Sequence, residues 1–165
     1  MGISLMRIDD RLIHGQVVLG WSKMLNATVI VVPDDAAAAD PMQVTMMKAA
    51  TPIGVRSSIV SIAEGAALLK DPKLNKEKVL VVVRGPESAF ALINAGVDIK
   101  KITIGNMRGE TGKKRVSKEV AVNEEEWNYF KKLDSKGIDL VVQWLPGGDT
   151  KNLNDMLKKQ DFGSL

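Results

Sequence analysis

Short runs of valine and isoleucine alternate with longer stretches of helical spacing along the whole chain. These runs, which we interpret as strands, span residues 3–8, 27–32, 55–60, 78–83, 102–105 and 138–142. Because parallel strands are joined by crossover connections that usually contain a helix, this alternation is typical of a mostly parallel sheet. The sequence therefore predicts an α/β fold: an open, doubly wound, mostly parallel sheet with helices on both faces.

The composition excludes several classes of protein. A length of 165 residues favours a single domain over residues 1–165, because one core of this size buries about 70% of its chain's surface. Apolar runs such as 79–83 are far shorter than the roughly 20 residues of a membrane-spanning helix. There is no cysteine, and a net charge of +3 is too small for a polycationic nucleic-acid surface. Because the amino end also lacks a secretory pattern, we expect a cytoplasmic protein.

Capping residues mark the start of several helices. Asp40 followed by Pro41 is typical of an N-cap and a first-turn proline, and this helix is predicted to end near Ala50. Three of its residues, which we expect to share a face against the sheet, are Met42, Met46 and Ala49. Further helices are predicted to begin near residue 15, at residues 85–86 and at residues 123–126.

The alternation is interrupted after the strand that ends at Gly105. Residues 106–114 are rich in glycine and basic side chains, and residues 115–122 return as a β-like run. This order predicts a loop followed by a short antiparallel pairing. The small residues 36–39 are interpreted as a tight connection.

The segment between the first strand and the first helix is crowded with ionisable side chains. These are Arg7, Asp9, Asp10, Arg11 and His14. In an open α/β sheet, ligands bind in the crevice beyond the carboxyl ends of the strands, where this segment lies. The helix that follows directs free N–H groups and the positive end of its dipole toward the same crevice. An anion is therefore the expected ligand.

His14, the only histidine of the chain, has four possible roles: nucleophile, general base, metal ligand or structural side chain. A metal site is disfavoured because no second histidine or cysteine exists. Nucleophilic catalysis fits better, since one imidazole nitrogen can attack phosphorus while the other donates a hydrogen bond to Asp10 or Asp9. Arg11 supplies a planar fork that matches phosphate oxygens. The alternative for these charged residues is a surface ion-pair network at a strand end.

The string from Arg7 to Val17, RIDDRLIHGQV, closely resembles the active-site segment of IIB subunits of the bacterial phosphotransferase system, in the mannose/fructose/sorbose class. The resemblance continues through residues 31–40, 102–107 and 120–137, so it covers most of the chain. It implies a mostly parallel sheet of about seven strands that includes one antiparallel strand. The run 115–122 is the expected candidate for that strand.

The resemblance implies an enzyme, a protein-N(π)-phosphohistidine–sugar phosphotransferase (IIB component). Such a protein accepts phosphate from a phosphohistidine of its IIA partner and passes it to a sugar carried by membrane IIC and IID subunits. His14 resembles the phosphorylated nucleophile, through Nδ1, and Arg11 the arginine that stabilises the phosphoryl group. Asp10 resembles the residue that orients the imidazole, with Asp9 in support. Because transfer between two imidazoles exchanges like for like, no metal, nucleotide or other cofactor is expected.

Three other segments border the predicted crevice. Residues 106–115 carry four cations that would attract a partner bearing phosphate and acidic side chains. They do not form a nucleotide P-loop, because the glycine spacing is wrong and Lys113 is followed by lysine. Asp34 and Asp35 follow Pro33 as turn residues and are not predicted to be catalytic. Residues 143–149 depart from the resemblance, and Trp144 within them is predicted to be a partner contact or a packed lid.

Two alternative functions remain open at the level of sequence. A regulatory module would sense an anion or a phosphoprotein in the same crevice without turnover, and His14 would never be phosphorylated. A Mg²⁺-dependent phosphatase would use Asp9 and Asp10, and its activity would survive the loss of His14 but not a chelator.

Overall fold

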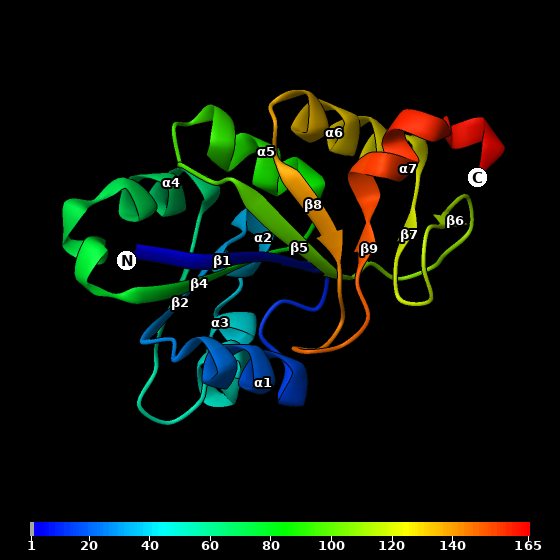
Figure 1. Ribbon diagram of the computed structural model, residues 1–165. Coiled ribbons are helices and arrows are strands. Elements are labelled where there is room, and N and C mark those ends of the chain that lie inside the picture. Colours follow the sequence, from blue (N-terminus) through cyan, green and yellow to red (C-terminus); the bar gives the residue numbers. More distant parts are fainter. Residues whose placement is uncertain (1) are drawn as a thin grey trace.

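Seven strands form the central sheet of the computed structural model, which describes residues 2–165 (Figure 1). Their order is β3-β2-β4-β1-β5-β8-β9. All neighbours run parallel except β8 and β9, which are antiparallel. The strands are β1 (Gly2–Asp9), β2 (Val29–Pro33), β3 (Arg56–Val60), β4 (Lys78–Val83), β5 (Lys101–Asn106), β8 (Asp139–Val142) and β9 (Lys151–Asn152). The predicted fold class and six predicted strands are confirmed.

The antiparallel strand of the sheet is not the run 115–122, so that expectation is wrong. The short antiparallel pairing predicted for this run is confirmed, but it forms a separate two-stranded ladder of β6 (Lys114–Arg115) and β7 (Ala121–Val122). The physical reason is that β8 pairs with β5 along its length and occupies the edge that residues 115–122 would have needed. The short strand β9 then covers the free edge of β8.

Helices cover both faces of the sheet (Figure 1). On one face lie α1 (Gly15–Leu25), α2 (Asp35–Ala38) and α3 (Pro41–Ala50). On the other lie α4 (Ile62–Lys70), α5 (Pro86–Asn94), α6 (Glu124–Ser135) and α7 (Leu153–Lys159). Two short 3₁₀ helices span Pro72–Lys76 and Phe162–Ser164. Each face has its own apolar core, and the larger one, under α4 to α7, contains Trp127 and Phe130.

The predicted helix starts agree with the structure. The Asp40 side chain accepts hydrogen bonds from the first turn of α3, and Asn123 forms a capping box with Glu126 at the start of α6. The prediction of a tight connection at residues 36–39 is wrong, because Asp35–Ala38 form one helical turn. The Asp34 carboxylate accepts the N–H of Ala37 and caps that turn, and alanine has the highest helix propensity.

The predicted packing face of α3 is also wrong. Met42 and Met46 are 71% and 65% exposed, and Ala49 is exposed as well. Met47 is the buried methionine of this helix, and Val44 packs beside it at i−3. Since α3 lies over the edge strand β3, only this narrow stripe finds a core to cover. The other methionines stay on the surface.

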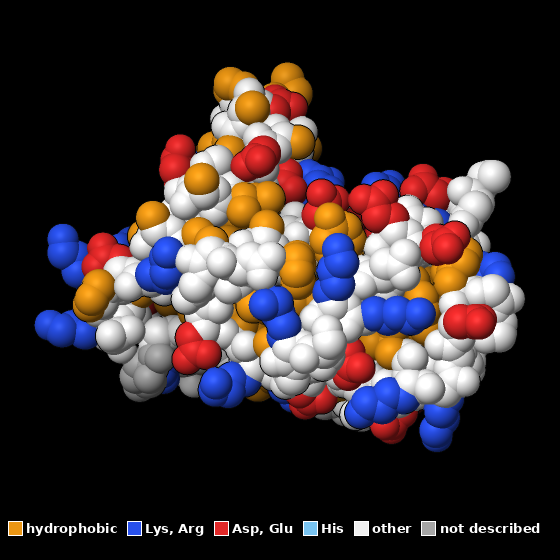
Figure 2. All heavy atoms as spheres, turned by 90° about the horizontal axis from the view of Figure 1, so that it is seen from above, with side chains coloured by type: hydrophobic (Ala, Val, Ile, Leu, Met, Phe, Trp, Pro, Cys, Tyr) orange, Lys and Arg blue, Asp and Glu red, His pale blue; other side chains and the backbone are white. Residues whose placement is uncertain are grey.

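The surface over α4 to α7 carries lysine and arginine side chains interspersed with aspartate and glutamate (Figure 2). Such mixing gives no single-sign field of the kind that attracts nucleic acid. Within residues 2–165, none of the helices combines the length and the apolar character needed to cross a membrane.

Candidate functional site

The segment between β1 and α1 lies at the carboxyl end of a central strand, with β4 and β5 on either side. His14 is the N-cap residue of α1, and its side chain makes no capping hydrogen bond. The free N–H groups of the first turn of α1 therefore remain available to an anion. Leu12 holds a φ of 59°, a left-handed conformation that is uncommon for leucine and is kept by its buried side chain. This tight turn brings the carbonyl of Leu12 back toward His14.

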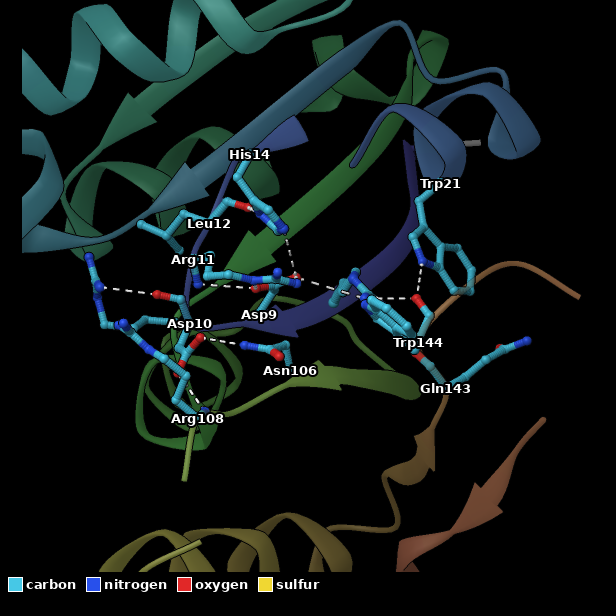
Figure 3. A network of polar contacts seen from close by, with 12 residues as sticks. Asp9, Asp10, Arg11, Leu12, His14, Trp21, Asn106, Arg108, Gln143 and Trp144 are labelled. Carbon is cyan, nitrogen blue, oxygen red and sulfur yellow. Dashed lines mark hydrogen bonds and ion pairs between the residues drawn. The ribbon is translucent and has the colours of Figure 1, made fainter. Parts of the chain in front are cut away.

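Two acceptors face the imidazole of His14 (Figure 3). Nδ1 lies 3.1 Å from the carbonyl oxygen of Leu12, and Nε2 lies 4.0 Å from Oδ2 of Asp9. A carbonyl oxygen can only accept, so Nδ1 carries a proton in this arrangement. Nε2 is buried and has no hydrogen-bond partner among the described residues, while the side chain as a whole is 26% exposed. The ring thus sits between solvent and a buried carboxylate.

Asp9 is that carboxylate, and it is fully buried. Its Oδ1 accepts the backbone N–H and the Nε–H of Arg11 at 3.0 and 3.2 Å, and its Oδ2 lies 3.4 Å from Nη2 of Arg11. Oδ2 also faces Nη2 of Arg7 at 3.8 Å. Asp9 therefore lies between two arginines and the imidazole, and Figure 3 shows its position relative to Arg11 and His14.

The structure does not bring Asp10 to the imidazole, although the sequence suggested it as the orienting residue. Its Oδ1 accepts from Nδ2 of Asn106 at 2.7 Å, and its Oδ2 accepts from the backbone N–H of Arg108 at 2.8 Å. These bonds tie the loop after β1 to the loop after β5. The carboxylate that faces His14 is that of Asp9, the last residue of β1, whereas Asp10 lies in the turn that follows and faces Asn106 and Arg108.

Arg84 belongs to the site, and the sequence reasoning missed it. It follows the apolar run of β4, so its position beyond a strand's carboxyl end was the available signal. Its guanidinium makes two hydrogen bonds to the buried Asp34, at 3.1 and 3.0 Å, and donates to the carbonyl of Asp10 at 3.3 Å. Hydrogen bonding to Asp34 raises the pKa of Arg84. Asp34 is thus a helix cap and a charge partner for Arg84.

A cavity of about 320 Å³ opens beside the imidazole. Its wall combines the two arginines Arg11 and Arg84 with His14 and the apolar side chains of Met46 and Met47. The cationic part of this wall suits phosphoryl oxygens, and the apolar part suits a protein surface.

The four cations of residues 106–115 are all engaged within the chain. Arg108 pairs with Asp10 at 3.6 Å, and Lys113 pairs with Glu126 at 3.2 Å. The other two, which donate to backbone carbonyls, are Lys114 and Arg115. Two of the four cations are therefore paired with carboxylates, and the other two keep their charge while their N–H groups bind backbone carbonyls.

The loop 143–149 touches the site through its backbone. The carbonyl of Trp144 accepts from Nε1 of Trp21 and from Arg7, each at 2.9 Å, and the side chain of Trp144 remains 40% exposed. Neither contact was predicted, because both depend on carbonyl groups that every residue possesses.

Comparison with known proteins identifies sequence relatives over nearly the whole chain. A family model described as "PTS system sorbose subfamily IIB component" matches residues 3–164. The chain is 35% identical over 161 residues to the mannose-specific EIIAB component of Escherichia coli K12, covering 98% of this chain and 50% of that protein. It therefore spans about half the length of this relative. It is 32% identical over 162 residues to the sorbose-specific EIIB component of Klebsiella pneumoniae, covering 98% of this chain and 99% of that protein.

Solved structures also resemble the fold of this chain. The crystal structure of the IIBSor domain of the sorbose permease from Klebsiella pneumoniae matches with a TM-score of 0.91 at 32% identity, over 98% of this chain and 99% of that chain. The N-acetylgalactosamine-specific IIB component 1 from Escherichia coli matches with a TM-score of 0.84 at 28% identity, over 91% and 98% of the two chains.

Proposed function

The chain belongs to the sorbose subfamily of IIB components of the phosphotransferase system, which take part in sugar phosphotransfer, and we propose that its own phosphoryl acceptor is His14. The donor is a phosphohistidine of a IIA protein, and the final acceptor is a sugar carried by membrane IIC and IID subunits. The relative named EIIAB joins IIA and IIB in one name, which supports a IIA partner. This relay places the chain in the cytoplasm, where it meets the membrane through its partners.

The observation that carries the proposal is the place of His14: partly exposed, at the N-terminus of α1, in a cavity with two arginines and above a buried carboxylate. In the transfer step, a lone pair of Nδ1 forms the new N–P bond while the N–P bond of the donor histidine breaks, and the donor nitrogen keeps that electron pair. His14 must therefore leave the carbonyl of Leu12 and hold its proton on Nε2, facing Asp9.

The charged residues divide the remaining work. Arg11, whose side chain is 34% exposed, presents its fork to the phosphoryl oxygens and offsets the charge of the transfer state. Asp9 accepts the Nε2–H of His14 and so orients the ring. Asp10 supports the site indirectly, because its bonds to Asn106 and Arg108 hold the loop that carries Arg11.

The exposed methionines of α3 supply a docking surface for IIA. Met46 lines the cavity beside His14, and Met42 lies one turn earlier on the same helix. Flexible, polarisable side chains of this kind adapt to partners that must bind and leave in turn. We therefore assign the docking contact to this apolar surface rather than to the cations of residues 106–115.

Intact-protein mass spectrometry tests the proposal. The parent chain and His14→Ala are incubated with phosphoenolpyruvate, the general phosphotransferase proteins and a cognate IIA. The expected result is a single acid-labile, base-stable phosphoryl adduct on the parent and none on the variant. NMR of the single imidazole then identifies the nitrogen, and attachment at Nε2 would overturn the Nδ1 assignment. If no adduct forms while the partners phosphorylate another acceptor, the relay is rejected in favour of a sensing module.

A further inference from the structure

Arg7 is a fully buried arginine in the middle of the sheet. Burial lowers its pKa to about 10, against the opposing effect of Asp9. Burying a guanidinium is costly unless its hydrogen bonds are met, so a chain keeps one where its contacts are needed. The proposed function uses Asp9, Arg11 and His14 but leaves Arg7 without a role.

The guanidinium of Arg7 connects two parts of the molecule that are distant in sequence. Nη1 donates to the carbonyl of Gln143 and Nη2 donates to the carbonyl of Trp144, each at 2.9 Å. Nη2 also faces Oδ2 of Asp9 at 3.8 Å. The same Trp144 carbonyl accepts from the indole of Trp21, whose ring lies 5.1 Å from the guanidinium carbon.

The neighbouring strand is shaped to hold this side chain. Gly105 of β5 lies under the guanidinium, and a β-carbon at that position would overlap the guanidinium carbon and nitrogens of Arg7. The register of β1 and β5 also shifts here, from Ile8 opposite Ile104 to Asp9 opposite Asn106, so that Gly105 is bulged out of the pairing. Two local departures from regular strand structure thus make room for one buried charge.

The position of Arg7 matters most when Arg11 turns toward a phosphoryl group. Arg11 supplies the hydrogen bonds to Asp9 in the free protein, and it is the partly exposed member of the pair. Once Arg11 engages phosphate, Arg7 is the cation that remains beside the buried Oδ2. Without Arg7, this carboxylate would keep only the backbone N–H of Arg11 at Oδ1, and its Oδ2 would have no cation beside it.

We propose that Arg7 is a positioning residue for phosphoryl transfer: it anchors Asp9 to the loop 143–149 and thereby holds the carboxylate that orients His14. The inference rests on the proposed function and deepens it. It also implies that phosphorylation of His14 affects the loop 143–149. When Arg11 leaves Asp9 for the phosphoryl group, Asp9 attracts Arg7 more strongly, and the hydrogen bonds of Arg7 to the carbonyls of Gln143 and Trp144 change. The indole N–H of Trp21 shares one of these acceptors and reports the change.

The test measures single-turnover transfer from phosphorylated IIA to His14 over a range of IIA concentrations. Arg7→Lys keeps the charge but loses the fork, and Gly105→Ala displaces the guanidinium without removing a charge. Both should lower the maximal rate about tenfold or more, as expected for a misplaced reacting group, while the half-saturating IIA concentration stays within about twofold. Arg56→Lys, an exposed arginine paired with Glu77, is the matched control and should transfer as the parent does.

A spectroscopic measurement on the parent protein makes the test independent of how the variants fold. The indole N–H resonance of Trp21 should shift when His14 is phosphorylated, and it should not respond in the same way in Arg7→Lys. Two results would overturn the role of Arg7 and leave the relay intact, provided that the parent transfers normally. One is transfer by Arg7→Lys at the parental rate, and the other is a Trp21 resonance that does not shift on phosphorylation. A parent that takes no phosphate on His14 overturns both.

Discussion

Replacing Asp9 and Asp10 separately by asparagine distinguishes two adjacent carboxylates that sequence treats as a pair. Asp9→Asn keeps the shape and one acceptor oxygen, but it places an N–H₂ group or a neutral oxygen where Oδ2 meets Arg7, Arg11 and His14. Asp10→Asn retains an acceptor for Asn106 or for the N–H of Arg108, and it loses the ion pair with the exposed Arg108 side chain.

The expected magnitudes follow from burial. Removing one partner of a buried ion pair costs about 3–5 kcal/mol, and because Arg11 remains partly solvated we expect about 3 kcal/mol for Asp9→Asn. Asp10→Asn loses an ion pair with an exposed arginine, which contributes at most about 1 kcal/mol, and one of two hydrogen bonds, which contributes about 1 kcal/mol, so it should cost roughly 2 kcal/mol. At about 2–4 °C per kcal/mol for a chain of this length, Tm falls by about 6–12 °C for Asp9→Asn and by about 4–8 °C for Asp10→Asn.

Thermal unfolding and single-turnover transfer from phosphorylated IIA measure the two effects. Asp9→Asn should slow transfer roughly 10–100-fold, since a reacting group displaced by about 1 Å loses up to about 10²-fold, and Asp10→Asn should slow it several times less. Equal losses in the two variants, or a slower transfer in Asp10→Asn, would refute the assignment of imidazole orientation to Asp9.

Further predictions concern Arg11, the docking surface, two helix glycines and an acid-sensitive cap. Arg11→Lys should slow transfer and lower Tm modestly while leaving the fold intact, because lysine keeps the charge but loses the fork that bonds the buried Asp9; an unaltered transfer rate would remove Arg11 from the mechanism. Met46→Ser should raise the half-saturating IIA concentration without lowering the maximal rate, whereas Met24→Ser, at an exposed site on α1, serves as its control. Gly20→Ala in α1, where a β-carbon meets only Pro146 at 3.9 Å, should stabilise by up to about 1 kcal/mol in urea unfolding. Gly65→Ala, whose β-carbon would lie 2.7 Å from Pro33 Cβ, should instead destabilise, and equal signs would contradict the packing of α4 on β2. Hydrogen bonds from Gln43 lower the pKa of Asp40 from its ordinary 3.8. The ionised cap therefore stabilises the fold above pH 3.8, and this contribution is lost as pH falls through the lower pKa of the folded state. Tm of Asp40→Asn should accordingly fall less steeply with acid than Tm of the parent.

Much of the fold was readable from the sequence because local patterns determine local structure. Buried parallel strands need continuous apolar runs such as those of β2 and β4. Capping residues such as Asp40 and Asn123 mark the positions where helices begin. The position of His14 after the first strand likewise placed it in the ligand crevice of an open sheet.

Features that depend on a neighbour in space were not readable. The rotation of α3 that exposes Met42 and Met46 depends on how much of β3 lies beneath the helix, and the identity of the antiparallel strand depends on which segment pairs with the free edge of β8. Sequence spacing contains neither piece of information.

The sequence alone determined a doubly wound sheet with the segment of ionisable residues around His14 at the carboxyl ends of its strands, because periodicity and capping act within a few residues. Tertiary structure decided which carboxylate faces the imidazole, and it buried Arg7 between Asp9 and the carbonyls of residues 143 and 144. The physical reason is that every residue has a backbone carbonyl, so the sequence does not show which carbonyls a buried arginine will bind. A charge that depends on such carbonyls, and on the space above Gly105, can be recognised only when the strands and the loop have been brought together.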